Sequence, residues 1–145
     1  MYDRSLLSTL CRCAWKVLSL YLHPSGTSDV RLRSLLWLTQ GVSLDDPKPG
    51  AVIAVQTFGD FLNFNPHLHI IASDGCFATD GGFMVGTEPD ASSLIDLFRG
   101  EVFKMLKKAG KIDDHIIENM LSWHHSGFNV YCGPAINPGD QQHYW

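Results

Sequence analysis

Two histidines, His67 and His69, form the feature of this sequence that most directly suggests chemistry. They stand two residues apart in the stretch Asn65-Pro66-His67-Leu68-His69, with an apolar residue between them. On a β-strand, that spacing puts both imidazoles on one face, roughly 6–7 Å apart at the backbone. Histidine is the commonest side-chain ligand of divalent metals. The pair therefore suggests part of a metal site, although a bare His-x-His pattern on a strand is more often structural.

A metal site of this kind needs a third ligand from a neighbouring element. Gln56, in the preceding apolar stretch, offers an amide oxygen, and Asp60 and Asp74 are rival candidates. Oxygen and imidazole ligands together suit Mg²⁺ or Mn²⁺, and the imidazoles favour manganese. Zinc is more expected with cysteine or a third histidine. We therefore predict a Mg²⁺ or Mn²⁺ site at Gln56, His67 and His69, where the metal would polarise a scissile phosphate.

The segments around the histidines predict β-strands. Residues 51–58 are nearly all apolar and rich in β-branched side chains, and residues 67–73 alternate with His67, His69 and Ile71 on one face. Residues 61–64 are short and aromatic and are either a loop or a hairpin arm. Asp74-Gly75 reads as a turn, after which residues 76–79 would begin a return strand and residues 83–85 would continue it.

The remaining segments predict helices and one last strand. Apolar residues with i, i+3, i+4 spacing predict amphipathic helices over 5–22 and 91–110, and a shorter helix over 113–122. Residues 30–39 are expected to form a short helix, 128–132 a strand and 133–139 a loop. The expected fold is α+β: an antiparallel sheet with the histidine strand near its centre and helices packed on one face.

Four lysines form a basic face on the helix predicted over 91–110 and just beyond it. They recur at i, i+3, i+4 and i+7, which is one face of a helix. Such a face can contact DNA phosphates, although it is more often simply solvated. The predicted DNA-binding residues are Lys104, Lys107, Lys108 and Lys111.

The bulk composition indicates one globular domain over residues 1–145. The net charge of −4 does not favour a stand-alone nucleic-acid binder, but basic segments flank an acid-rich centre over residues 41–97. No apolar run approaches the roughly 20 residues of a membrane span, and the N-terminus lacks the order of a signal peptide. The four cysteines contain no Cys-x-x-Cys pair, so buried free thiols in the cytoplasm are expected.

Two stretches of the sequence resemble a known family. The first is Ala54-Val55-Gln56-Thr57-Phe58-Gly59-Asp60 followed by Asn63-Phe64-Asn65-Pro66-His67-Leu68-His69. The second is Trp123-His124-His125-Ser126-Gly127-Phe128-Asn129-Val130. In order and spacing, both resemble blocks of the rolling-circle insertion-sequence transposases of the HUH endonuclease superfamily. The resemblance covers roughly residues 5–136.

This resemblance implies a HUH nuclease-like core that cleaves and joins single-stranded DNA at transposon ends. A tyrosine of the family attacks a phosphodiester and forms a phosphotyrosine link to a 5′ DNA end. His67 and His69 correspond to the family's metal-binding pair, and Gln56 to its third ligand. Asp60 and His125 are possible neighbours of the site, whereas Trp123 and Phe128 are expected to be core aromatics.

The nucleophile is the least matched part of the resemblance. The family places its tyrosine on a helix after the second block, in an Arg-Tyr-Ile-like context. Tyr144 is nearest to that position but lies in His-Tyr-Trp, and Tyr131 is expected to pack within a strand. The family also carries an upstream zinc-binding segment. We therefore interpret the sequence as a truncated transposase core, inactive in strand cleavage, with the true nucleophile beyond Trp145. The alternatives are a non-catalytic DNA-binding remnant and an unrelated metal-dependent hydrolase.

Overall fold

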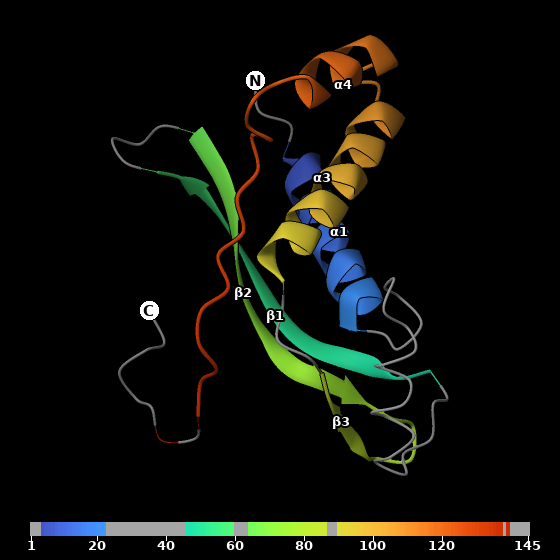
Figure 1. The fold of residues 1–145 in the computed structure, drawn as a ribbon, viewed down its shortest axis with the longest axis vertical. Coiled ribbons are helices and arrows are strands. Elements are labelled where there is room, and N and C mark those ends of the chain that lie inside the picture. Colours follow the sequence, from blue (N-terminus) through green and yellow to red (C-terminus); the bar gives the residue numbers. More distant parts are fainter. Residues whose placement is uncertain (1–3, 23–45, 60–63, 87–89, 138, 140–145) are drawn as a thin grey trace.

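The first helix, α1 (Ser5–Leu22), contacts both a long β-hairpin and the second long helix, α3 (Ala91–Lys108), in a computed structural model. The structure describes residues 4–22, 46–59, 64–86, 90–137 and 139. The other elements are β1 (Lys48–Phe58), β2 (Phe64–Phe77), β3 (Phe83–Val85) and α4 (Asp114–Leu121). The α+β prediction is confirmed, and the hairpin curves around α1 (Figure 1). The helix predicted over 30–39 lies outside the described residues.

The sheet is antiparallel, with its three strands in the order β1-β2-β3. The histidine strand, β2, is therefore central, as predicted. Two irregularities interrupt its pairing with β1. At the first, Asn65 and Pro66 together face Thr57, because Gln56 pairs with His67 and Phe58 with Phe64. A bulge suits proline, which has no N–H to donate to the ladder. The strand predicted over 67–73 therefore begins earlier, at Phe64.

The predicted turn at Asp74-Gly75 is wrong, because β2 continues to Phe77. The chain reverses only after Ala78, whose N–H donates to the Gly82 carbonyl at 2.8 Å. Residues 76 and 77 therefore end β2, and the return strand is β3. A Cβ added at Gly75 would lie 1.8 Å from the Met84 carbonyl oxygen. Gly75 thus serves a close approach between two strands and not a turn.

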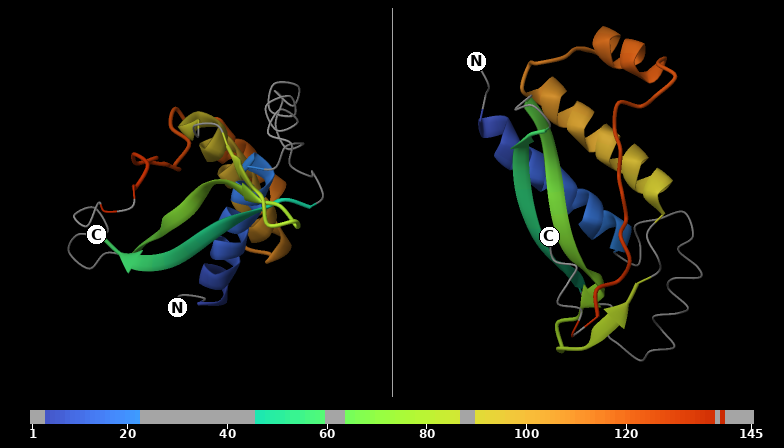
Figure 2. Two further views of the ribbon diagram at one scale, coloured as in Figure 1. Left: turned by 90° about the horizontal axis from the view of Figure 1, so that it is seen from below. Right: turned by 90° about the vertical axis from the view of Figure 1, so that its left-hand side faces the viewer.

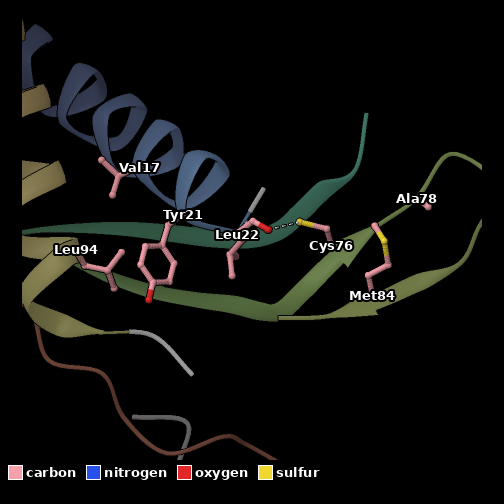
Figure 3. Close-up of a cluster of buried hydrophobic side chains, with 7 residues drawn as sticks. All are labelled: Val17, Tyr21, Leu22, Cys76, Ala78, Met84 and Leu94. Atoms are coloured by element: carbon pink, nitrogen blue, oxygen red, sulfur yellow. Dashed lines mark hydrogen bonds between the residues drawn. The ribbon is translucent and has the colours of Figure 1, made fainter. Parts of the chain in front are cut away.

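The hydrophobic core joins the C-terminal end of α1 to the β2–β3 end of the sheet and to the start of α3 (Figure 3). Cys76 and Met84 are completely buried. Burial raises the pKa of the Cys76 thiol to about 11, so this thiol is inert. All four cysteines are free, as predicted, although Cys11 and Cys132 are only partly buried. The members of the core are Val17, Tyr21, Leu22, Cys76, Ala78, Met84 and Leu94.

The helix boundaries follow from local signals. Asp90 caps α3 by accepting hydrogen bonds from the N–H groups of Ser92 and Ser93, and Asp113 caps α4 through the N–H of Ile116. Gly110, with φ of +65°, lies just beyond α3. These three helices confirm the predictions for 5–22, 91–110 and 113–122 to within two residues. None of the described helices is long and apolar enough to cross a membrane.

The strand predicted over 128–132 is not formed. This segment alternates between half-buried and exposed residues, as a strand would, but it makes no ladder pairing with the described sheet. Side chains hold it instead: the Phe128 ring lies 6.0 Å from Phe98 and 5.8 Å from Phe103, both on α3. The segment runs from α4 back along the molecule (Figure 2).

Candidate metal site

The two histidine rings lie together on the open face of the sheet. Their centroids are 5.0 Å apart and their planes are inclined by 66°. The register pairs His67 with Gln56 and His69 with Ala54, so all four residues share one face. Val52 and Ile71, paired on that same face, are 70% and 56% exposed. The site is therefore open to solvent on the side of the sheet away from α1, where a polymer could reach it.

Gln56 is the third side chain that the fold brings to this place. Its Oε1 lies 3.1 Å from the Nε2 of His69, and its Nε2 donates to the Phe58 carbonyl at 3.2 Å. The second bond orients the amide so that its oxygen points toward the histidine. Ligands about 2.1 Å from one ion and at right angles to each other are about 3.0 Å apart. Because an amide oxygen only accepts, the Nε2 of His69 donates to Gln56 as the pair stands. A metal ion would take the place of that proton, and a separation of 3.1 Å fits two neighbouring ligands of a single ion.

A backbone carbonyl sets the tautomer of His67. The Nδ1 of His67 lies 2.8 Å from the carbonyl oxygen of Asn65. A carbonyl oxygen only accepts hydrogen bonds, so Nδ1 carries the proton and the Nε2 lone pair is available. Metal-binding histidines characteristically donate their other ring N–H in this way. The sequence analysis did not predict this role of Asn65. The signal that could have indicated it was Pro66, because a proline within a strand is typical of a bulge.

Of the other two candidate ligands, the structure describes only one. Asp60 lies outside the described residues, and the backbone oxygen of Asp74 bonds Gly86 at the far irregularity of β2. Asp74 stands five positions from His69 along the strand, roughly 17 Å away. Within the described part of the chain, no three His, Cys, Asp or Glu side chains gather to hold a metal. The candidate site is thus two imidazoles and one amide oxygen, a set that suits manganese or magnesium more than zinc.

The second sequence block begins in a turn after α4. Residues 122–125, called the aromatic turn below, place the rings of Trp123 and His125 6.0 Å apart. Trp123 is 53% exposed, so the expectation that it belongs to the core is wrong, whereas Phe128 is half-buried against α3. Tyr131, expected to pack, is 87% exposed, because the segment that carries it pairs with no described strand. Tyr144 lies outside the described residues.

The lysine face on and beyond α3 is partly neutralised by acids. Lys104 pairs with Glu101 at 2.9 Å, and Lys107 pairs with Asp114 of α4 at 2.6 Å. Glu101 also binds Lys16 of α1 at 2.7 Å, and its two lysine partners lower its pKa. Lys108 makes no ion pair with any described residue. The four lysines therefore differ in how readily they could contact a phosphate.

Comparison with known proteins identifies the family. The model of a family described as "Putative transposase" matches residues 50–144, a range that contains Gln56, both histidines and the aromatic turn. The searches of curated proteins and of solved structures found no match. Membership supports a role in DNA transposition. Because the match covers more than half of the 145 residues, this chain belongs to the Putative transposase family.

Proposed function

We propose that this chain supplies the metal-binding centre of a HUH-type transposase that cuts and rejoins single-stranded DNA at transposon ends. The observation that carries the proposal is the convergence of His67, His69 and Gln56 on one open face of the sheet. Membership in the transposase family supplies the substrate class. The fold supports the assignment because it is α+β with the histidines on the central strand.

Each residue of the centre has a definable task. His67 presents Nε2 because its Nδ1 is held by the Asn65 carbonyl. His69 and Gln56 supply a nitrogen and an oxygen at a separation suited to one ion. Mg²⁺ or Mn²⁺ bound there would polarise the scissile phosphate and stabilise the leaving oxygen. Leu68, which is half-buried on the opposite face, anchors the strand between the two histidines.

The covalent step uses a tyrosine as nucleophile. The tyrosine hydroxyl gives up its proton and its oxygen attacks phosphorus. The bond from phosphorus to the 3′ oxygen breaks, this oxygen takes a proton, and the 5′ end remains on the enzyme as phosphotyrosine. Attack by another DNA 3′ hydroxyl on the phosphotyrosine joins the strands and restores the tyrosine. We do not assign this role to Tyr131, whose side chain is 87% exposed on a segment that pairs with no described strand.

The metal centre is tested by calorimetric titration of the chain with manganese. We expect His67→Ala and His69→Ala each to abolish measurable manganese binding, because each substitution removes one of only three proposed protein ligands. His115→Ala is the matched control, since it removes an exposed histidine on α4. Binding that survives both substitutions unchanged would overturn the proposed centre, and it would also exclude a hydrolase that uses the same pair.

Strand cleavage is tested separately with a labelled single-stranded oligonucleotide and manganese. We expect no covalent adduct from Tyr144, because its sequence context differs from that of the family's nucleophile. An adduct that disappears in Tyr144→Phe but persists in Tyr131→Phe would show instead that Tyr144 is the nucleophile. Manganese binding without an adduct would support a metal centre whose tyrosine is not Tyr144.

A further inference from the structure

The aromatic turn after α4 is an exposed feature that the metal centre does not explain. Ser122, Trp123, His124 and His125 line an open, mostly apolar depression of about 470 Å³. A half-exposed tryptophan beside a histidine ring leaves a large aromatic surface in water. Such a ring offers a flat π-face on which another aromatic group can stack.

The turn is held in place on both sides. On one side, Ser122 ends α4: its N–H donates to the carbonyls of Glu118 and Asn119, and its hydroxyl donates to Asn119 at 2.7 Å. On the other side, the Ser126 hydroxyl bonds both the N–H and the carbonyl of Phe128. Phe128 in turn packs on α3. Trp123 is therefore presented from a supported backbone, which reduces the entropy lost when a ligand binds.

The turn lies at the same end of the molecule as two other features suited to DNA. The C-terminal end of α3, which carries the lysine face, leads directly into α4 (Figures 1 and 2). The start of β2, the strand that carries the histidine pair, also lies toward this end of the molecule (Figure 1). These features therefore share one end of the molecule, although the histidines look out from the sheet face opposite α1, whereas α3 packs on α1.

We propose that the aromatic turn binds one unpaired nucleobase of single-stranded DNA, stacked on Trp123 with His125 beside it. The inference rests on the proposed function for its ligand class but requires no metal. Stacking suits this site because every base has a π-face, and tryptophan offers the largest side-chain partner. Duplex DNA would not fit this role, since its bases are already stacked on each other.

The test measures the affinity of the full chain for a fluorescein-labelled single-stranded oligonucleotide of mixed sequence, in EDTA. The same measurement is made with an oligonucleotide of equal length that lacks its bases. The variants are Trp123→Ala, Trp123→Phe and His125→Ala. The matched control is Trp15→Ala, which removes another exposed tryptophan, 39% exposed on α1. Circular dichroism verifies that each variant is folded.

We expect Trp123→Ala to weaken binding of the normal strand about 5- to 150-fold, the range for one stacked base. His125→Ala should weaken it less, and Trp123→Phe should retain most of the affinity because a phenyl ring also stacks. Trp15→Ala should change the affinity for the normal strand by no more than about twofold. None of the variants should change the affinity for the base-free strand by more than about twofold.

Three results would overturn the inference. One is a Trp123→Ala protein that binds the normal strand as the Trp15→Ala protein does. Another is an equal loss of affinity for the base-free strand, which would indicate contact with the backbone only. The third is a change in oligomeric mass on Trp123→Ala with DNA affinity unchanged, which would assign the turn to contact between copies. Manganese binding is measured independently, so a failure here is distinguishable from a failure of the metal centre.

Discussion

The Nε2 atom of His69 lies 3.1 Å from the Oε1 atom of Gln56 on the neighbouring strand. These residues are thirteen positions apart in sequence and meet because β1 and β2 pair in one particular register. A shift of that register by one residue would turn Gln56 to the opposite face of the sheet. The bulge at Asn65 and Pro66 lies directly beside the pair. The local irregularity and the register together therefore build the candidate metal site.

Gln56 should contribute to metal affinity through its amide oxygen. We expect Gln56→Ala to weaken manganese binding about 10- to 100-fold, while Gln56→Glu binds at least as tightly because it offers a charged oxygen. The measurement is calorimetric titration. Thr57→Ala, next along the strand and on the opposite face, is the control. If Gln56→Ala binds as tightly as Thr57→Ala, the third ligand lies elsewhere.

The lysine face should contribute unequally to DNA binding. Lys104 and Lys107 are paired with carboxylates, whereas Lys108 has no ion-pair partner among the described residues. A phosphate contact contributes about 0.7 to the slope of log affinity against log salt for single strands. We expect Lys108→Ala to reduce that slope by about this amount and Lys104→Ala to reduce it less. Equal slopes for both variants and the wild type would show that the face is only solvated.

Two glycines should respond to alanine with opposite signs. Gly75→Ala should destabilise the fold by about 3 kcal/mol or more, because the new Cβ would meet the Met84 carbonyl oxygen. Gly100, within α3, has no atom within 4 Å of an added Cβ. There, alanine should stabilise the fold by about 0.5–1 kcal/mol, because it restricts the unfolded chain. Urea unfolding measures both, and a Gly75→Ala protein of wild-type stability would contradict the strand packing.

The cap of α3 should make stability depend on acid pH. Hydrogen bonds from the hydroxyl and N–H of Ser93, then from Ser92, lower the pKa of Asp90 from 3.8 to about 2. Because the folded pKa lies below the ordinary one, the ionised cap stabilises the fold above about pH 4. That contribution is lost as the pH falls from about 4 to about 2.

The measurement compares thermal midpoints of the wild type and Asp90→Ala between pH 2 and 6. The gap between the two proteins should be largest near pH 6 and should close toward pH 2. Asp96→Asn, which changes an exposed carboxylate on the same helix, is the control for general charge effects. A gap that stays constant over this range would contradict the role of the ionised cap.

The sequence by itself determined what depends on neighbours a few residues away. Apolar spacing of three and four residues defined α1, α3 and α4, and two of these helices begin beside an acidic cap residue in the structure. The alternation of His67, His69 and Ile71 also showed that both imidazoles share a face. These features could be predicted because helical periodicity, capping and the two-residue repeat of a strand act within one or two turns of chain.

Only the tertiary structure decided how distant segments meet. Gly75 looked like a turn residue, but its pairing with β3 leaves no room for a side chain there. Residues 128–132 had the alternation of a strand, but Phe128 docks on α3 and no described strand pairs with them. Trp123 was expected in the core because of its large aromatic side chain, but the structure leaves that side chain exposed. Register, close backbone approach and burial depend on contacts between segments far apart in sequence, and local patterns carry no information about them.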